Sequence, residues 1–292
     1  MQPPPNDAQI PSPTLESLEA TTRESIVEFH RSRFVPNNAV LVVAGDIDPD
    51  ALIQRAEGLF ADWSGAELPR DSFPEPPKRT SRAAYLVDRP GSAQSNIVIA
   101  NGGGITRTSP DYFPMLLMHT VLGANASSRL FMNLREEKGY TYGAYSSLDA
   151  RRDGGSFRVS AEVRTPVTED SLKEFFFELG RIRNEPVSEK EIEDAKSYLT
   201  GVFPIRLETQ EGLIEQIVQI KMLGLPNNYL ETYRQKIQDV QIDEVQRVAN
   251  KYIRPDEAAI VIVGDGAEIT EQVKPFADAV ETYNTAGERV GD

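Results

Sequence analysis

A short stretch of this sequence occurs twice, and the repeat limits what the chain can fold into. "PNNAVLVVAGD" spans residues 36–46 and "PDEAAIVIVGD" spans residues 255–265, at a constant offset of 219 residues. Five matched positions are identical, namely Pro, Ala, Val, Gly and Asp. Each copy follows an amphipathic helical pattern and a Pro-led turn, and its apolar, β-branched run predicts a buried strand. Five identities at one offset favour a duplicated helix-turn-strand unit over two unrelated units that converged.

The repeat also predicts the domain organisation. A Pro-rich stretch at residues 67–79, "ELPRDSFPEPPKR", has the composition of a linker. The second unit begins near Arg82, and subtracting the offset of 219 places the start of the first unit upstream of Met1. We therefore expect the later part of a longer two-unit protein. Its expected parts are a disordered or extended tail (1–13), the C-terminal part of a first unit (14–65), a linker (66–82), a complete second unit (83–270) and a C-terminal tail (271–292).

The second unit has the patterns of a mixed helix and strand domain. "AAYLV" and "SNIVIA" predict two strands, and "YTYGAYSSLDA" and "GSFRVSAEVR" predict two more, joined by the hairpin signal "RRDGG". A helix is expected from Ser109, and a second helical stretch ends at Gly139. Further helices follow Thr168, before a last strand at 258–263. This order predicts an α+β fold of duplicated units, each an antiparallel sheet with helices packed on one face.

Three helix starts carry capping signals. Thr21 with Glu24, and Ser188 with Glu191, have the spacing of a capping box. Asp243 is expected to cap the helix of the second repeat copy. These positions fix where we expect the chain to enter each helix.

Composition excludes several classes of function. The net charge of −14 argues against binding to nucleic acid, whose phosphates would be repelled. No apolar run is long enough for a membrane span. The chain has no cysteine, which excludes disulfides, cysteine zinc knuckles and thiol nucleophiles. The acidic balance favours a solvated surface.

The two histidines do not form a metal motif. His30 lies in a helical pattern beside apolar residues, which favours a half-buried helical histidine. His119 lies inside "MLLMHTVL", which favours a hydrogen-bonded histidine of the core. The two are far apart in sequence, so their spacing gives no zinc site, and we expect no metal ligand and no catalytic residue in this chain.

Other candidate motifs also have structural explanations. Glu208, Glu211 and Glu215 fall at helical spacing, as on a solvated helix face. The glycines Gly102–Gly104 lack both the G-x-G-x-x-G pattern and a P-loop lysine, so they predict a flexible connection. Ser127 and Ser128 have no histidine in a triad pattern.

One stretch, "LREEKGYTYG", leaves two interpretations open. Arg135 ends a helical stretch, and Tyr142 follows seven residues later on the opening strand. Spacing alone favours a surface arginine and a strand aromatic that packs on a neighbour. Alternatively, both point into one cleft, where a guanidinium and a phenol could hydrogen-bond a peptide carbonyl as it gains negative charge.

The stretch "SSRLFMNLREEKGYTYGAYSS" resembles the second-half signature of the pitrilysin/insulinase-type zinc metallopeptidases, a family that includes the mitochondrial processing peptidases. The beginning of the chain, through "PNNAVLVVAGDIDP", resembles the end of that family's first half. The whole is similar to a bacterial processing-peptidase-like protein. The resemblance implies two homologous α+β halves that face each other, with zinc held by an H-x-x-E-H motif in the first half. It also implies that Arg135 and Tyr142 bind substrate.

The sequence departs from the zinc motif where the second unit would need it. An H-x-x-E-H motif there requires a histidine at position 115, a glutamate at position 118 and a histidine at position 119. The chain has Met115, Met118 and His119. The resemblance therefore implies a non-catalytic half that is inactive alone. Its zinc-bearing half would lie upstream or in a partner subunit, as a homodimer or heterodimer, and its substrates would be peptides. The alternative is a structural or interaction scaffold of the same fold without peptidase activity.

Overall fold

The structure is a computed structural model that describes residues 14–69, 79–102 and 104–290. The chain divides into two compact units. One comprises Met1–Glu75 with Leu207–Lys221, and the other comprises Pro76–Arg206 with Met222–Asp292.

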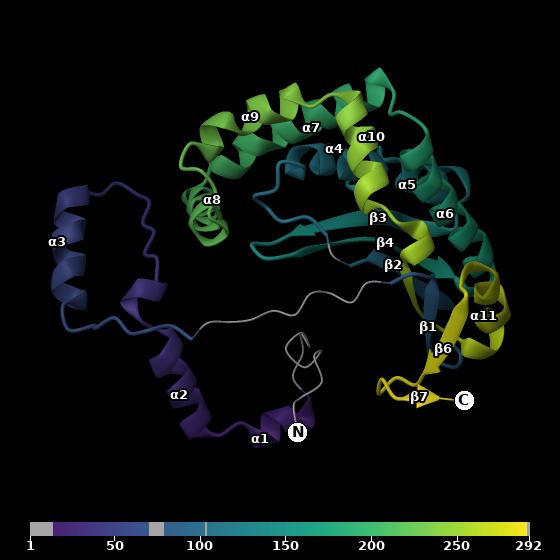
Figure 1. The fold of residues 1–292 in the computed structure, drawn as a ribbon, viewed down its shortest axis with the longest axis horizontal. Coiled ribbons are helices and arrows are strands. Elements are labelled where there is room, and N and C mark those ends of the chain that lie inside the picture. Colours follow the sequence, from purple (N-terminus) through teal and green to yellow (C-terminus); the bar gives the residue numbers. More distant parts are fainter. Residues whose placement is uncertain (1–13, 70–78, 103, 291–292) are drawn as a thin grey trace. The chain divides into compact units, whose positions relative to one another are not determined.

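The second unit is built on a seven-stranded sheet of order β3-β4-β2-β5-β1-β6-β7 (Figure 1). β2 pairs antiparallel with β4 and β5, whereas β1 pairs parallel with β5 and β6. The expected antiparallel sheet is a mixed one, because β1 and β2 are not neighbours and β5 lies between them, parallel to β1 and antiparallel to β2. The strands are β1 (Ala83–Asp88), β2 (Gln94–Asn101), β3 (Thr141–Ala150), β4 (Gly155–Arg164), β5 (Ala259–Gly264), β6 (Ala279–Tyr283) and β7 (Arg289–Val290).

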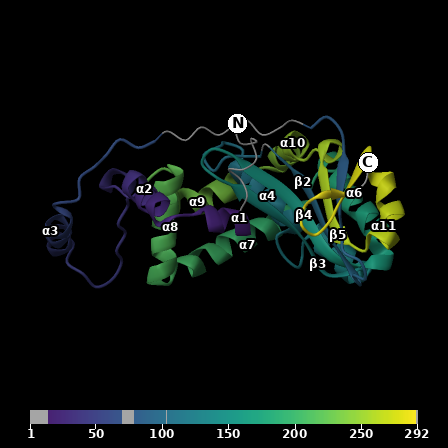
Figure 2. The same ribbon diagram turned by 90° about the horizontal axis from the view of Figure 1, so that it is seen from below.

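Helices pack on this sheet and form one apolar core with it (Figures 1 and 2). Leu86, Ile97 and Ile262 of the strands are fully buried, as are Met118 and Phe175 of the helices. Each such side chain contributes about 1.5–3 kcal/mol on burial. The helical elements are α4 (Tyr112–Gly123), α5 (Arg129–Phe131), the π-helical η3 (Met132–Glu137), η4 (Thr165–Val167), α6 (Thr168–Asn184), α7 (Glu189–Leu207), α9 (Tyr229–Asp239), α10 (Ile242–Tyr252), η5 (Pro255–Glu257), α11 (Gly266–Val273) and η6 (Lys274–Phe276).

The helix starts agree with the capping signals in part. Ser188 and Glu191 exchange the two hydrogen bonds of a capping box at the start of α7. The helix expected from Ser109 begins instead after Asp111, because Ser109 and Pro110 lie in the turn before it. The cap of α10 is Gln241 rather than Asp243, because Gln241 and Glu244 form the reciprocal pair at the helix start.

The end of the chain continues the sheet. Residues beyond 270, where the sequence suggested a tail, include β6, which pairs with β1 from Ala83 to Val87. Arg82 connects the two ends of the unit, because its guanidinium donates to the carbonyls of Pro255 and Phe276 and lies 4.1 Å from the Phe176 ring.

The first unit contains α1 (Leu15–Ala20), α2 (Arg23–Arg33), η2 (Pro36–Asn38) and α3 (Pro49–Phe60), together with most of α8 (Gln210–Leu223). α2 is capped by Thr22, whose Oγ1 accepts from the Ser25 backbone N–H, while Ser25 Oγ accepts from the Thr22 backbone N–H. The capping box therefore lies one residue later than the Thr21 and Glu24 pair predicted from sequence.

The duplication is visible in the helices but not in the strand. α2 and α10 begin and end 219 residues apart, as do η2 and η5. The predicted strand at 39–44 is wrong, because these residues form no ladder with other described residues, whereas its counterpart β5 lies between β1 and β2. Without such neighbours the segment keeps its apolar side chains exposed, with Val40 at 55% and Leu41 at 64%.

Candidate functional site

Arg135 and Tyr142 come together at the junction of η3 and β3. Arg135 Nη1 donates a hydrogen bond of 3.0 Å to the carbonyl oxygen of Tyr142, and its Nε donates to Glu136 at 3.0 Å. The guanidinium carbon lies 5.4 Å from the centroid of the Phe131 ring. The side chain of Tyr142 is 87% exposed. Spacing alone favoured a Tyr142 side chain that packs on a neighbouring residue. That interpretation is wrong, because the side chain is exposed.

Local backbone geometry produces this arrangement. Gly139 ends the helical stretch with a positive φ of 64°, a conformation that favours glycine, and turns the chain into β3. The ladder between β3 and β4 then shifts register between Thr141 and Ala144. Thr141 Oγ1 accepts from Gly143 N and donates to the Glu162 carbonyl, which stabilises the irregular turn of the strand. Such bulges re-aim side chains, and this one directs Tyr142 out of the regular ladder.

The inner side of η3 is fixed to the neighbouring helix. Asn133 donates through Nδ2 to Glu174 at 2.9 Å and to Glu178 at 3.0 Å, both on α6. Lys138 forms an ion pair with Glu174 at 3.4 Å. These contacts leave Arg135 on the outer side. A π-helical segment is rare and often occurs at functional sites.

A second anchor lies just before η3. Arg129, whose side chain is 5% exposed, donates to both carboxylate oxygens of Glu191, at 2.6 and 3.0 Å. Burial alone would raise the pKa of Glu191, but the hydrogen bonds from Arg129 and Ser188 lower it to about 2. The pair therefore holds the start of the Arg135 segment against α7 through a bidentate, charge-assisted contact.

Chemically, the outer pair offers hydrogen-bond donors. A guanidinium carries five N–H donors, and Arg135 uses two nitrogens in the described contacts. A phenol O–H can donate to a carbonyl oxygen as that oxygen becomes negative. The arrangement can bind and polarise a carbonyl group.

Helix α4 does not fit zinc. Met115 and Met118 occupy two of the three motif positions and are 1% and 0% exposed, so they pack in the core. His119 Nδ1 lies 2.6 Å from Ser146 Oγ, and burial lowers its pKa to about 4, so the ring is neutral at pH 7. This agrees with a hydrogen-bonded histidine of the core. Among the described residues, no three His, Asp or Glu side chains are close enough to hold a metal ion.

The remaining sequence candidates lie on the surface or outside the described residues. Glu208, Glu211 and Glu215 are exposed, as expected for a solvated row. His30 is exposed rather than half-buried, because no residue of α2 is buried; its ring stacks on Phe34 with centroids 4.9 Å apart. Of the three consecutive glycines, Gly103 lies outside the described residues. In the part of the chain that the structure describes, no helix combines the length and apolarity of a membrane span.

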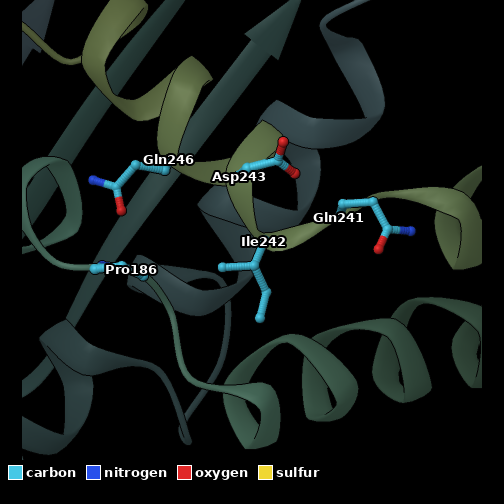
Figure 3. Close-up of a pocket in the computed structure, with 5 residues that line it drawn as sticks. All are labelled: Pro186, Gln241, Ile242, Asp243 and Gln246. Carbon is cyan, nitrogen blue, oxygen red and sulfur yellow. The ribbon is translucent and has the colours of Figure 1, made fainter.

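A pocket of about 490 Å³ lies at the start of α10 and is lined by Pro186, Gln241, Ile242, Asp243 and Gln246 (Figure 3). The Gln246 amide donates to the carbonyl oxygen of Arg183. Asp243 is the one ionisable side chain among these lining residues, so this pocket offers no pair of groups for acid and base chemistry.

A larger pocket, of about 580 Å³, was missed by sequence reasoning. It is lined by Arg107 and Tyr229, which are 122 residues apart in the chain and are joined by a hydrogen bond of 2.8 Å. No local pattern in the sequence signals this pair, because only the fold brings α9 to the loop before α4.

Comparison with known proteins assigns the family. A model of the family described as peptidase M16 inactive domain matches residues 20–199. The chain belongs to this family. The assignment confirms the resemblance drawn from the Arg135 and Tyr142 stretch, and it identifies the chain as a non-catalytic part of the fold.

Individual relatives agree with this assignment. An uncharacterised zinc protease of Streptomyces coelicolor is 29% identical over 253 residues, which cover 85% of this chain and 55% of that protein. A non-peptidase homologue of Helicobacter pylori is 22% identical over 258 residues, covering 86% and 58%. A crystal structure of a peptidase M16 inactive domain from Pseudomonas fluorescens superimposes with a TM-score of 0.78 at 24% identity, covering 86% of this chain and 59% of that one. The chain thus spans little more than half the length of these relatives.

Proposed function

We propose that this chain is the substrate-binding, non-catalytic part of a zinc metalloendopeptidase of the pitrilysin/insulinase type. The observation that carries the proposal is the exposure of Tyr142 beside Arg135. Three tyrosines of the second unit, Tyr112, Tyr229 and Tyr233, are between 3% and 6% exposed. Tyr142 is 87% exposed although it lies in the longest hairpin of the sheet. A large aromatic side chain held outward by a bulge is available for a ligand.

The metal chemistry would come from another half. Zinc would be held by an H-x-x-E-H motif, either elsewhere in the full-length protein or in a partner subunit, because Met115 and Met118 cannot replace the missing ligand and base. This chain would contribute hydrogen bonds from Arg135 and Tyr142 to the peptide backbone. Peptides are the expected substrates, since these donors suit a carbonyl group.

The first unit supports a two-half assembly. α2 and η2 repeat α10 and η5, yet the segment 39–44 has no strand partners among the described residues. In the second unit the equivalent strand lies between a parallel and an antiparallel neighbour. We infer that residues 14–65 complete another unit of the same kind, in which residues 39–44 pair as β5 does.

The test is peptide cleavage by the chain assembled with its zinc-bearing half. Tyr142→Phe should lower kcat/KM by about a hundredfold or more, the usual cost of one preorganised oxyanion donor. Arg135→Lys should also lower it, because an ammonium cannot keep the two-nitrogen geometry. Tyr198→Phe is the matched control, as Tyr198 is 41% exposed on α7. Equal activity of the Tyr142 and Tyr198 variants would refute the role of the phenol.

A scaffold function is the second candidate. It is favoured by the Helicobacter pylori relative, which is itself a non-peptidase homologue. A scaffold would form its complex normally while the Arg135 and Tyr142 variants left any associated cleavage unchanged. Measuring complex formation by size-exclusion chromatography alongside cleavage separates the two functions.

A further inference from the structure

The pocket of about 580 Å³ lies between the loop before α4, the first turn of α4 and helix α9 with its preceding loop. Its size is that of a small-molecule site. Aromatic side chains form its wall, because Phe113 stacks on Tyr229 with ring centroids 6.1 Å apart, and Tyr233 packs against both rings. Tyr229 and Tyr233 are 3% and 6% exposed, so this wall is fixed in the core.

Arg107 brings a guanidinium into this aromatic surrounding with no acidic partner among the described residues. Its carbon lies 4.0 Å from the centroid of the Tyr112 ring, and its Nη2 donates to the Tyr229 hydroxyl at 2.8 Å. The Nε atom is buried without a hydrogen bond to any described residue. The ionisable groups that act on it are Tyr229, Tyr233 and Arg206. Burial raises the pKa of Tyr229 to about 12, so this phenol supplies no negative charge at pH 7.

Arg107 is half-buried, and a guanidinium without a counter-charge is unfavourable in such a place. Arginine is rarely buried unless it is paired, because taking its charge out of water costs several kcal/mol. Burial lowers the pKa of Arg107, which is the sign of that cost. The chain carries 45 acidic residues against 31 basic ones, so the lack of an acidic partner for Arg107 does not come from a shortage of carboxylates. The absence of one among the described residues leaves the positive charge for a ligand.

The second cation of the pocket is Lys236. Its ammonium lies 5.5 Å from the centroid of the Phe113 ring. Two carboxylates also line the pocket and keep their negative charge, although each accepts a local hydrogen bond: Asp239 from Gln235 at 2.6 Å and Glu244 from the Gln241 backbone N–H at 2.9 Å. The lining therefore combines two cations, both in contact with aromatic rings, with two carboxylates engaged in local hydrogen bonds and an aromatic wall.

We propose that this pocket binds an organic anion that has an apolar, preferably aromatic, body and a carboxylate or phosphate head. Arg107 and Lys236 take the head, and the Phe113 and Tyr229 rings take the body. The site is separate from Arg135 and Tyr142. Arg107 hydrogen-bonds through its backbone N–H to the carbonyl of Arg151, just past the end of β3, whereas Tyr142 lies at the beginning of that strand. The separation along the strand is about 30 Å.

The experiment is isothermal titration calorimetry of the full chain with three probes that share a phenyl body. These are 3-phenylpropanoate, phenyl phosphate and the neutral 3-phenylpropanamide, in buffer of low ionic strength. At least one anion should bind about tenfold or more tightly than the amide, and binding should weaken with added salt. The tighter of the two anions identifies the head group as carboxylate or phosphate.

Variants tie the binding to the pocket. Arg107→Met keeps the length of the side chain, removes its charge and should weaken the anion about tenfold or more. Lys236→Met should weaken it severalfold and serves if the Arg107 variant does not fold. The matched control is Arg234→Met, because Arg234 lies exposed on the same helix and does not line the pocket.

Three results would overturn the proposal. The first is equal affinity for the amide and the anions. The second is no binding of either anion at about 10 mM, a concentration above a Kd of about 1 mM. The third is an equal loss of anion affinity in the Arg234 and Arg107 variants. None of them depends on a zinc-bearing half, so the outcome is independent of the proposed peptidase role.

Discussion

Asp111 is the most informative residue to perturb, because one carboxylate holds the start of α4 to α10. Its oxygens accept from Arg247 at 2.7 Å, from Lys251 at 2.8 Å and from the Tyr252 hydroxyl at 2.8 Å. The side chain of Asp111 is 8% exposed. Asp111→Asn keeps the shape but removes the charge, and it places an amide N–H₂ against a cation.

The cost can be worked from these contacts. A hydrogen bond to a charged group contributes about 1.5–3 kcal/mol. Adding this value for all three contacts would overestimate the stability that the substitution removes. Arg247 and Lys251 are 49% and 57% exposed, so both regain water when the carboxylate is lost, and their share is small. We expect Asp111→Asn to lower the free energy of unfolding by about 2–4 kcal/mol, and Tm by roughly 4–10 °C.

The pH dependence identifies the cause. The hydrogen bond from Arg247, aided by Lys251 and Tyr252, holds the pKa of Asp111 well below its usual range against the opposing effect of burial. A lowered folded-state pKa gives stability that is complete above the unfolded pKa of about 3.9 and is lost as pH falls toward the folded value. The gap between wild type and variant should be equal at pH 7 and pH 5 and about 1 kcal/mol smaller at pH 3.

Urea unfolding followed by far-UV circular dichroism measures this gap. Asp153→Asn, in the exposed turn between β3 and β4, is the control and should change stability by less than about 0.5 kcal/mol. A gap for Asp111→Asn that is under about 0.5 kcal/mol at pH 7, or that does not shrink by pH 3, would refute the reasoning.

Three substitutions in the second unit should also change its stability. Gly123→Ala would place a Cβ 2.4 Å from the backbone N of Ser146, so α4 must move away from β3, at a cost of about 1–3 kcal/mol. At Gly180 a Cβ would meet nothing within 4 Å, so Gly180→Ala should stabilise the protein by about 0.5–1 kcal/mol. Glu191→Gln removes the partner of the buried Arg129 and should cost about 3–5 kcal/mol at pH 7. Because the pKa of Glu191 is lowered to about 2, that difference should shrink from about pH 4.5 downward, and chemical denaturation at several pH values measures both effects.

Much of the fold could be predicted from local pattern. The hairpin of β3 and β4, the capping box of Ser188 and Glu191, and the buried strand β5 all follow from residues close together in the sequence. The neighbours of β1 could not be predicted, because β5 and β6 lie far along the chain. Nor could the extension of the sheet beyond residue 270, which depends on β1 offering an edge to β6.

The candidate site also has features that follow from nearby residues and features that depend on distant ones. Arg135 and Tyr142 are seven residues apart, so their proximity follows from one helix end and one turn. The register shift between Thr141 and Ala144, which directs the phenol outward, depends on pairing with β4 and has no signature in the stretch itself. The pair of Arg107 and Tyr229 depends on the fold alone.

The two copies of the repeat have similar sequences, but only the second forms a strand. Residues 39–44 and 258–263 are similar apolar runs rich in β-branched side chains, and the helix and turn before each copy form at the same offset. Helices and turns close their hydrogen bonds locally, so they need no distant backbone partner. A strand needs partners on its edges, and β5 has them in β1 and β2 while residues 39–44 have none among the described residues. The same sequence pattern therefore gives a buried strand in one place and an exposed apolar segment in the other.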